Sequence, residues 1–225
     1  MDVWLNIIMA RLMKYSEAFL TGCDEKQEWM LSWFFKNYKK HNDTPLVFAD
    51  FGMSDTGRAI VRENAHAIVN LSDEKGKGWF LKPKAMCHCP ANKSVWIDLD
   101  CEVKGDISPI FDLLVPEKLN MVEDVPWSKR REETWHNSGV VGYIGKPTIL
   151  KKWRKKVEEK PKVGDQEVLH SMLNPITRMT YINDLPRIYN TLRIDLVDKS
   201  APKDPVIVHW TGAKGKDEIR RQMNA

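Results

Sequence analysis

Two carboxylates stand two residues apart in Asp98-Leu99-Asp100, directly after the apolar stretch 94–97. That stretch has the character of a buried strand, and alternation along it places both carboxylates on one side. Carboxylates held this close repel each other, and a hard divalent cation relieves the repulsion. The carboxyl end of a strand in an open α/β sheet is also where ligands bind. The motif therefore indicates a metal-dependent ligand site. Taken alone, it is equally compatible with Asp98 capping a turn and Asp100 being only solvated.

The elements that must position this pair follow an α/β pattern, in which short apolar runs alternate with helical periodicity. Strands are expected at 18–20, 45–51, 94–97, 119–122, 137–144 and 206–210. Helices are expected at 25–41, 56–67, 80–89, 107–114, 148–160, 166–173 and 216–223. Residues 124–136 are expected to form a polar loop with basic and aromatic side chains. No repeat or linker interrupts the chain, which predicts one compact domain over 14–225 after an extension or short helix at 1–13.

Composition excludes several classes of protein. The 225 residues include 42% hydrophobic and 29% charged residues, which are ordinary globular values and exclude a disordered or fibrous chain. The net charge of +4 is too small to indicate nucleic-acid binding. Cys87-His88-Cys89 has no second ligand pair at zinc spacing. The four cysteines are expected to be free thiols in a reducing cytoplasm.

The longest apolar stretch, residues 3–13, is interrupted by Asn6 and Arg11. It is shorter than the roughly 20 residues that a membrane span needs. It also lacks the basic start and small-residue cleavage site of a signal peptide. We therefore expect no transmembrane segment and a cytoplasmic protein, with peripheral attachment through this stretch left open.

Several motifs together resemble those of the GT-A glycosyltransferases, and above all the glycogenin-like, family-eight enzymes. Residues 94–103 resemble the Asp-x-Asp strand of that family. The other matching segments follow in the family's order and span residues 18 to 216: Thr21-Gly22-Cys23-Asp24, Lys82, His136-Asn137-Ser138-Gly139-Val140, Gly164-Asp165-Gln166, Leu185-Pro186-Arg187-Ile188-Tyr189-Asn190 and His209-Trp210-Thr211-Gly212-Ala213-Lys214. Each motif is weak alone, but their shared order makes the set specific.

The resemblance implies a GT-A fold with a mostly parallel central sheet flanked by helices. It also implies metal-dependent transfer of a hexose, such as glucose, from a UDP-sugar to an unknown glycan, protein or small-molecule acceptor. Retention at the anomeric carbon is implied as well. The cofactor would be Mn²⁺ or Mg²⁺, held by Asp98, Asp100 and His209.

The remaining roles follow from the same resemblance. Asp165 and Gln166 would lie near the anomeric carbon as the catalytic pair. Asp165 would also suit the N-cap of the following helix, and both roles are compatible. Contacts to the nucleotide sugar are implied for Thr21, Gly22, Asp24, Lys82, Leu99, Asn137, Ser138, Gly212 and Lys214. The closing lysine of the family motif falls at Lys214 or Lys216.

Two other functions stay open at this point. A nucleotidyltransferase would share the sheet and the acidic metal site, but it needs a glycine-rich, basic phosphate loop, and Thr21-Gly22-Cys23-Asp24 has one glycine and no nearby arginine. A non-enzymatic binder of glycan or nucleic acid would use Trp127, Trp135 and the basic run at 129–131. That alternative gives no reason for the ordered set of polar motifs.

Overall fold

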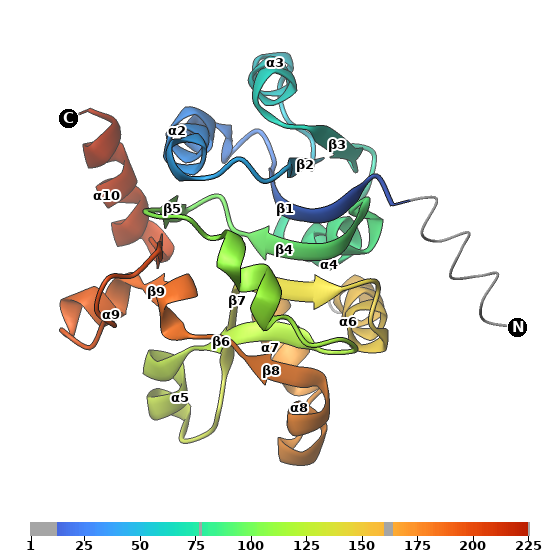
Figure 1. Cartoon of the computed structure of the whole chain (residues 1–225), viewed down its shortest axis with the longest axis vertical. Helices are drawn as coiled ribbons and strands as arrows, with labels where there is room; N and C mark the ends of the chain where they lie inside the picture. The colour runs from blue at the N-terminus through green and yellow to red at the C-terminus, as the bar shows by residue number, and fades with distance from the viewer. Residues whose placement is uncertain (1–12, 77, 160–163, 225) are drawn as a thin grey trace, which may run out of the picture.

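A seven-stranded sheet forms the centre of the protein, for which a computed structural model describes residues 13–76, 78–159 and 164–224. Strand β7 is antiparallel to both of its neighbours, and the other neighbouring pairs are parallel. The expected mostly parallel sheet is therefore confirmed. In spatial order (Figure 1) the strands are β3 (Ala67–Asn70), β2 (Leu46–Asp50), β1 (Tyr15–Cys23), β4 (Ala91–Ile97), β7 (His136–Ile144), β6 (Leu119–Glu123) and β8 (Ile182–Asp184).

The central strands are buried on both faces, which is why their sequences are apolar runs rather than alternating patterns. All five residues of β2 are buried, and so are eight of the nine residues of β7. Adjacent residues of β1 belong to different cores, Phe19 to one face and Leu20 to the other. The first core includes side chains of α2 (Leu31–His41), and the second includes side chains of α4 (Gly78–His88) and α6 (Thr148–Glu159).

A second, three-stranded sheet lies beyond the carboxyl end of β4. It consists of β5 (Cys101–Val103), β10 (Ile207–His209) and β9 (Thr191–Leu192), in that order. Strand β5 continues the chain from the acidic pair, and it runs antiparallel to β10 with Cys101 opposite His209. This pairing brings the C-terminal part of the chain to the end of β4, where α10 (Gly212–Met223) follows (Figure 1).

The other elements connect these two sheets. They are η1 (Glu28–Met30), α3 (Asp55–Asn64), η2 (Ser108–Leu113), α5 (Val125–Arg131), α7 (Asp165–Ser171), α8 (Pro175–Tyr181), η3 (Arg187–Tyr189) and α9 (Arg193–Val197). Within the described ranges, no helix is long and apolar enough to cross a membrane. The extension predicted at 1–13 lies outside the described residues, apart from Met13.

Three predictions about elements are wrong for local reasons. The polar loop expected at 124–136 contains α5, because the Asp124 side chain accepts a hydrogen bond from the Trp127 amide (3.1 Å) and Pro126 suits a helix start. The helix expected at 56–67 ends at Asn64, and strand β3 follows it. The last helix begins at Gly212 instead of residue 216.

Candidate active site and metal centre

The acidic pair lies where β4 leaves the core and turns into β5. The turn is closed by a hydrogen bond from the Cys101 amide to the Asp98 carbonyl (3.0 Å), and the Asp98 amide donates to the Gly139 carbonyl of β7 (2.8 Å). The Trp96 indole donates to Asp98 Oδ1 at 2.6 Å. Backbone and side chain of Asp98 are therefore both held in place, as a metal ligand requires.

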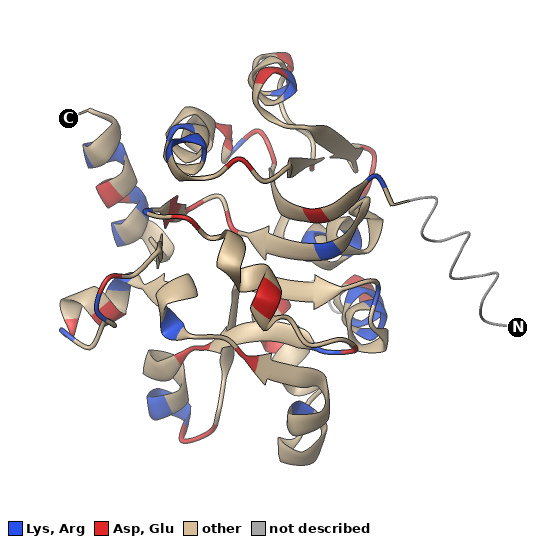
Figure 2. Ribbon diagram, in the orientation of Figure 1, with Lys and Arg blue, Asp and Glu red and all other residues tan. Residues whose placement is uncertain are grey.

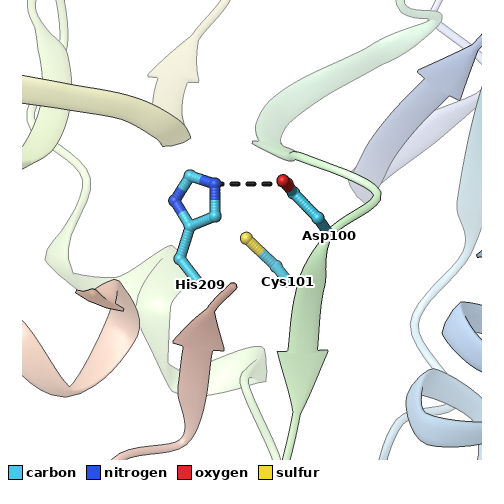
Figure 3. Close-up of side chains that lie close together, drawn as sticks. All are labelled: Asp100, Cys101 and His209. Atoms are coloured by element: carbon cyan, nitrogen blue, oxygen red, sulfur yellow. Dashed lines mark ion pairs between the residues drawn. The ribbon is translucent and has the colours of Figure 1, made fainter. Parts of the chain in front are cut away.

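His209 of β10 faces Asp100 (Figure 3). Its Nε2 lies 3.2 Å from Asp100 Oδ1 and 3.9 Å from Asp98 Oδ2. Asp100 also forms an ion pair with Lys216 of α10 at 3.0 Å. The structure thus brings together the three residues that the sequence analysis gives as metal ligands.

The chemistry of these residues fits a hard divalent metal ion. Donor atoms of Asp100, Cys101 and His209 all lie within 4.8 Å of one another. Burial, together with the nearby Asp100 and Asp98, raises the pKa of Cys101 well above its usual value, so the thiol stays protonated and is a poor ligand. The remaining donors are carboxylate oxygens and one imidazole nitrogen, a set that suits Mn²⁺ and also Mg²⁺.

The other ring nitrogen of His209 is held by two side-chain amides. Its Nδ1 lies 3.2 Å from Asn137 Oδ1 and 3.2 Å from Asn190 Oδ1, and Asn190 Nδ2 donates to Asn137 Oδ1 at 2.9 Å. Both atoms facing Nδ1 are acceptors, so Nδ1 carries the proton and Nε2 is turned toward the carboxylates. Asn190 is absent from the predicted site residues, although the segment 185–190 belongs to the family resemblance.

The charge of His209 gives the metal-free protein a defined pH dependence. Burial alone would lower the pKa of His209, but Asp100 and then Asp98 raise it above the usual value. Because the pKa of His209 is raised on folding, its protonation stabilises the folded protein. This stabilisation is complete below about pH 6.5 and is lost as the pH rises through the folded-state pKa.

We expect the Tm of the metal-free protein to fall between about pH 6.5 and the folded-state pKa of His209, and we expect the His209→Gln variant to lack this fall. Stabilisation by Mn²⁺, which needs the neutral ring, should grow over the same interval. Thermal melts at a series of pH values check this, and parallel curves for both proteins would contradict it.

Gly139 of β7 leaves room for the His209 ring. A methyl group there would collide with the His209 ring and with Asn137 Oδ1. We expect Gly139→Ala to weaken Mn²⁺ binding by about 10–100-fold, because the ligand's supporting contacts are displaced. Gly142→Ala, on the same strand, is the matched control. Its added methyl group would crowd Leu114, away from the metal site. Both substitutions should lower the Tm, but titration calorimetry should show weaker Mn²⁺ binding in Gly139→Ala alone. Equal Mn²⁺ affinities in the two variants would refute the assignment of His209 as a metal ligand.

Lys82 links the metal site to a second acidic residue. Its buried ammonium lies 3.0 Å from Asp98 Oδ1 and 3.0 Å from Asp165 Oδ2, and it donates to the Ser138 carbonyl (3.0 Å) and hydroxyl (3.2 Å). Burial would lower the pKa of Lys82, yet Asp165 and Asp98 raise it above its ordinary value. Burial also raises the pKa of Asp165, while Lys82 opposes the rise. A permanent positive charge therefore sits between two carboxylates.

Asp165 and Gln166 are the first two residues of α7, on the far side of Lys82. Gly164 is the N-cap of this helix, so the N-cap role expected for Asp165 is wrong. The Asp165 carbonyl accepts from the Trp153 indole at 2.9 Å. Gln166 Oε1 accepts from the Asn137 side chain and the Ser138 amide, each at 3.2 Å. Gln166 Nε2 and Asn137 Nδ2 both donate to Asp124 Oδ2 at 3.2 Å. Sequence reasoning missed Asp124, whose sequence signal is only that of an N-cap before a proline.

Two cavities meet at Asp165. The first, of about 290 Å³, is lined by four of the predicted donor contacts, Gly22, Asp24, Lys82 and Leu99, and by Asp98, Asp100 and Asp165, with Lys216, Trp79 and Trp96 among the others. The second, of about 530 Å³, is lined by Asn137, Ser138 and Gln166 and by side chains of α5 and α9. The polar site therefore opens to space on both sides of Asp165.

Three predicted contact residues lie elsewhere. Thr21 is completely buried in β1 and lines neither cavity. Gly212, with a φ of 72°, and Lys214 are exposed at the start of α10. Lys216, the alternative in the sequence, is the lysine that contacts Asp100, since residues two apart on a helix differ by about 200° in direction.

The architecture is that of the GT-A glycosyltransferases. Comparison with protein-family models and with curated protein sequences gave no match. Among solved structures, the galactosyltransferase LgtC in complex with donor and acceptor sugar analogues is similar to this chain, with a TM-score of 0.67, 14% identity and coverage of 92% of this chain and 94% of LgtC.

Two further structures agree with that fold. The glycosyltransferase GlyE of Streptococcus pneumoniae, in its apo form, matches with a TM-score of 0.66 and 17% identity over 88% of this chain and 55% of GlyE. Mouse xyloside xylosyltransferase 1 matches with a TM-score of 0.55 and 13% identity over 87% of this chain and 97% of the enzyme. At these identities the comparisons establish the fold, which the sequence analysis predicted.

Proposed function

We propose that this protein is a metal-dependent glycosyltransferase that moves a hexose, such as glucose, from a UDP-sugar to an acceptor hydroxyl. The observation that carries the proposal is the convergence of Asp98, Asp100 and His209 beside the buried Lys82. Both carboxylates and the lysine line one cavity. The fold shared with known sugar transferases supports it. The four free thiols agree with the cytoplasmic location that we infer.

One set of site residues would act on the diphosphate leaving group, and Asp165 would act on the donor sugar. Asp98, Asp100 and His209 would hold Mn²⁺ or Mg²⁺, which supplies Lewis-acid stabilisation of charge on the β-phosphate when bound. Lys82 adds fixed positive charge beside the diphosphate in a site shielded from water. Asp165, fixed at the start of α7, orients the donor sugar and stabilises positive charge that develops at its anomeric carbon.

The bond changes are those of a glycosyl transfer. The bond between the anomeric carbon and the β-phosphate oxygen breaks, and its electron pair leaves with the nucleoside diphosphate. The acceptor oxygen bonds to the anomeric carbon and gives up its proton. Retention of configuration, which the family resemblance implies, is part of the proposal.

Donor binding can be tested by thermal melts with Mn²⁺ and a panel of nucleotide sugars. A donor at a hundred times its Kd should add about 2.7 kcal/mol of stability, or roughly 5–10 °C in Tm for a chain of this size. We expect a UDP-hexose to give the largest shift and the shift to require Mn²⁺. The proposal is wrong if no nucleotide sugar raises the Tm, and an oligonucleotide-dependent shift would support a binding module in its place.

A further inference from the structure

The second cavity is a site of ligand size separate from the cavity that holds the metal ligands Asp98 and Asp100, although Asn137 and Ser138 in its wall are also predicted donor contacts. Its volume of about 530 Å³ lies within the range of known small-molecule sites. It is walled by α5, the start of α9, the start of β7 and the start of α7. Asp165 lines both cavities, so a ligand in the second one would face the sugar of a donor held in the first.

Two guanidinium groups in its wall have no acidic partner within the described ranges. Arg130 lies over the Trp127 ring at 5.0 Å, and Arg193 Nε donates to the Thr211 carbonyl at 3.3 Å. Neither arginine forms an ion pair with another residue in the part of the chain that the structure describes. Each guanidinium has five donors, and most of these donors are left for a ligand. Helix α5, at the lower left of Figure 2, ends in basic residues.

The two buried carboxylates of the same wall are already occupied. Asp124 accepts from the Trp127 amide and from two side-chain amides, and Asp165 is paired with Lys82. Glu167 is the remaining acid in the lining and is exposed to solvent. The groups still free to bind a ligand are therefore mainly cationic, which favours a carboxylate or phosphate.

We propose that the second cavity binds the acceptor and that this acceptor is a sugar carrying an anionic group, which pairs with Arg130 and Arg193. The inference rests on the proposed function. A hydroxyl oxygen of this sugar bonds to the anomeric carbon as the bond to the β-phosphate oxygen breaks, and the hydroxyl proton passes to the departing diphosphate. Trp127 acts as a positioning residue, because its ring holds the Arg130 guanidinium at the cavity.

Direct binding of three probes tests this without knowledge of the natural acceptor. Glucose 6-phosphate, glucuronate and glucose are titrated by ligand-observed NMR against the protein, with and without saturating UDP and the diamagnetic Mg²⁺. We expect at least one of the two anions to bind tenfold or more tightly than glucose, and its affinity to fall with added salt. The relative affinities of the two anions tell phosphate from carboxylate.

Arginine variants locate the site. The double variant Arg130→Gln/Arg193→Gln should weaken anion binding at least fivefold. Arg131→Gln is the matched control, because Arg131 also lies over Trp127, at 4.8 Å, but does not line the cavity. Anions that bind no better than glucose, or equal losses in Arg131→Gln and the double variant, overturn the inference. Donor melts on the same samples report separately on the proposed function, so either proposal can fail without the other.

Discussion

Asp100→Asn is expected to lower donor turnover by about a thousandfold or more. Asp100 is a predicted metal ligand, and it also holds His209 Nε2 at 3.2 Å and Lys216 at 3.0 Å. Burial would raise the pKa of Asp100, but His209 and Lys216 bring it below its usual value, so the carboxylate is charged at all working pH values. A neutral amide of the same shape removes that charge, and Lewis-acid stabilisation is worth several kcal/mol of the barrier.

The measurement pairs Mn²⁺ titration calorimetry with a turnover assay for nucleoside diphosphate release. Asp217→Asn is a suitable control, since it changes an exposed aspartate of α10 that pairs only with Arg220 among the described residues. The account requires Asp100→Asn to lose both metal affinity and turnover while remaining folded. Wild-type metal affinity in Asp100→Asn would remove Asp100 from the ligand set.

Lys82→Met is expected to have the largest effect on stability, a loss of about 3–5 kcal/mol at pH 7. The side chain is buried and neutralises Asp98 and Asp165 at once, so its removal leaves Asp165 without a counter-charge and Asp98 with His209 alone, 3.9 Å away. The loss should shrink as the pH falls, because burial raises the pKa of Asp165 and protonation of that carboxyl relieves the uncompensated charge.

Lys84→Met gives the comparison on the same helix. Lys84 pairs with the more exposed Glu74, so its loss should change stability by about 1 kcal/mol or less. Urea unfolding at pH 7 and pH 4.5 measures both variants. Similar free energies of unfolding for Lys82→Met and Lys84→Met at pH 7 would show that Lys82 does not neutralise the buried pair.

Sequence reasoning reached the features that are local in the chain. An apolar run ending in Asp98-Leu99-Asp100 is enough to place two carboxylates at a strand end, and the structure has them there. The mostly parallel sheet followed from the alternation of strand and helix patterns. Helix α5 is not evident from the sequence, because none of its residues is buried and its local signal is the single cap at Asp124.

Other features depend on pairings that no short segment contains. His209 reaches Asp100 because β10 pairs with β5 across more than a hundred residues of sequence, and only the family resemblance anticipated it. Asn190 and Asp124 are ordinary turn and cap residues in sequence, and they gain their roles by hydrogen bonding to His209, Asn137 and Gln166. The choice between Lys214 and Lys216 depends on where α10 begins, which propensity does not fix to one residue.

The most direct test of the central claim is nucleoside diphosphate release from UDP-glucose and other nucleotide sugars, measured without an acceptor. Water can then attack the anomeric carbon, so the assay does not depend on the acceptor's identity. The account predicts slow release that requires Mn²⁺ or Mg²⁺, stops with a chelator and is lost in Asp100→Asn. Absence of release from every donor, or release that neither the chelator nor Asp100→Asn reduces, would contradict it.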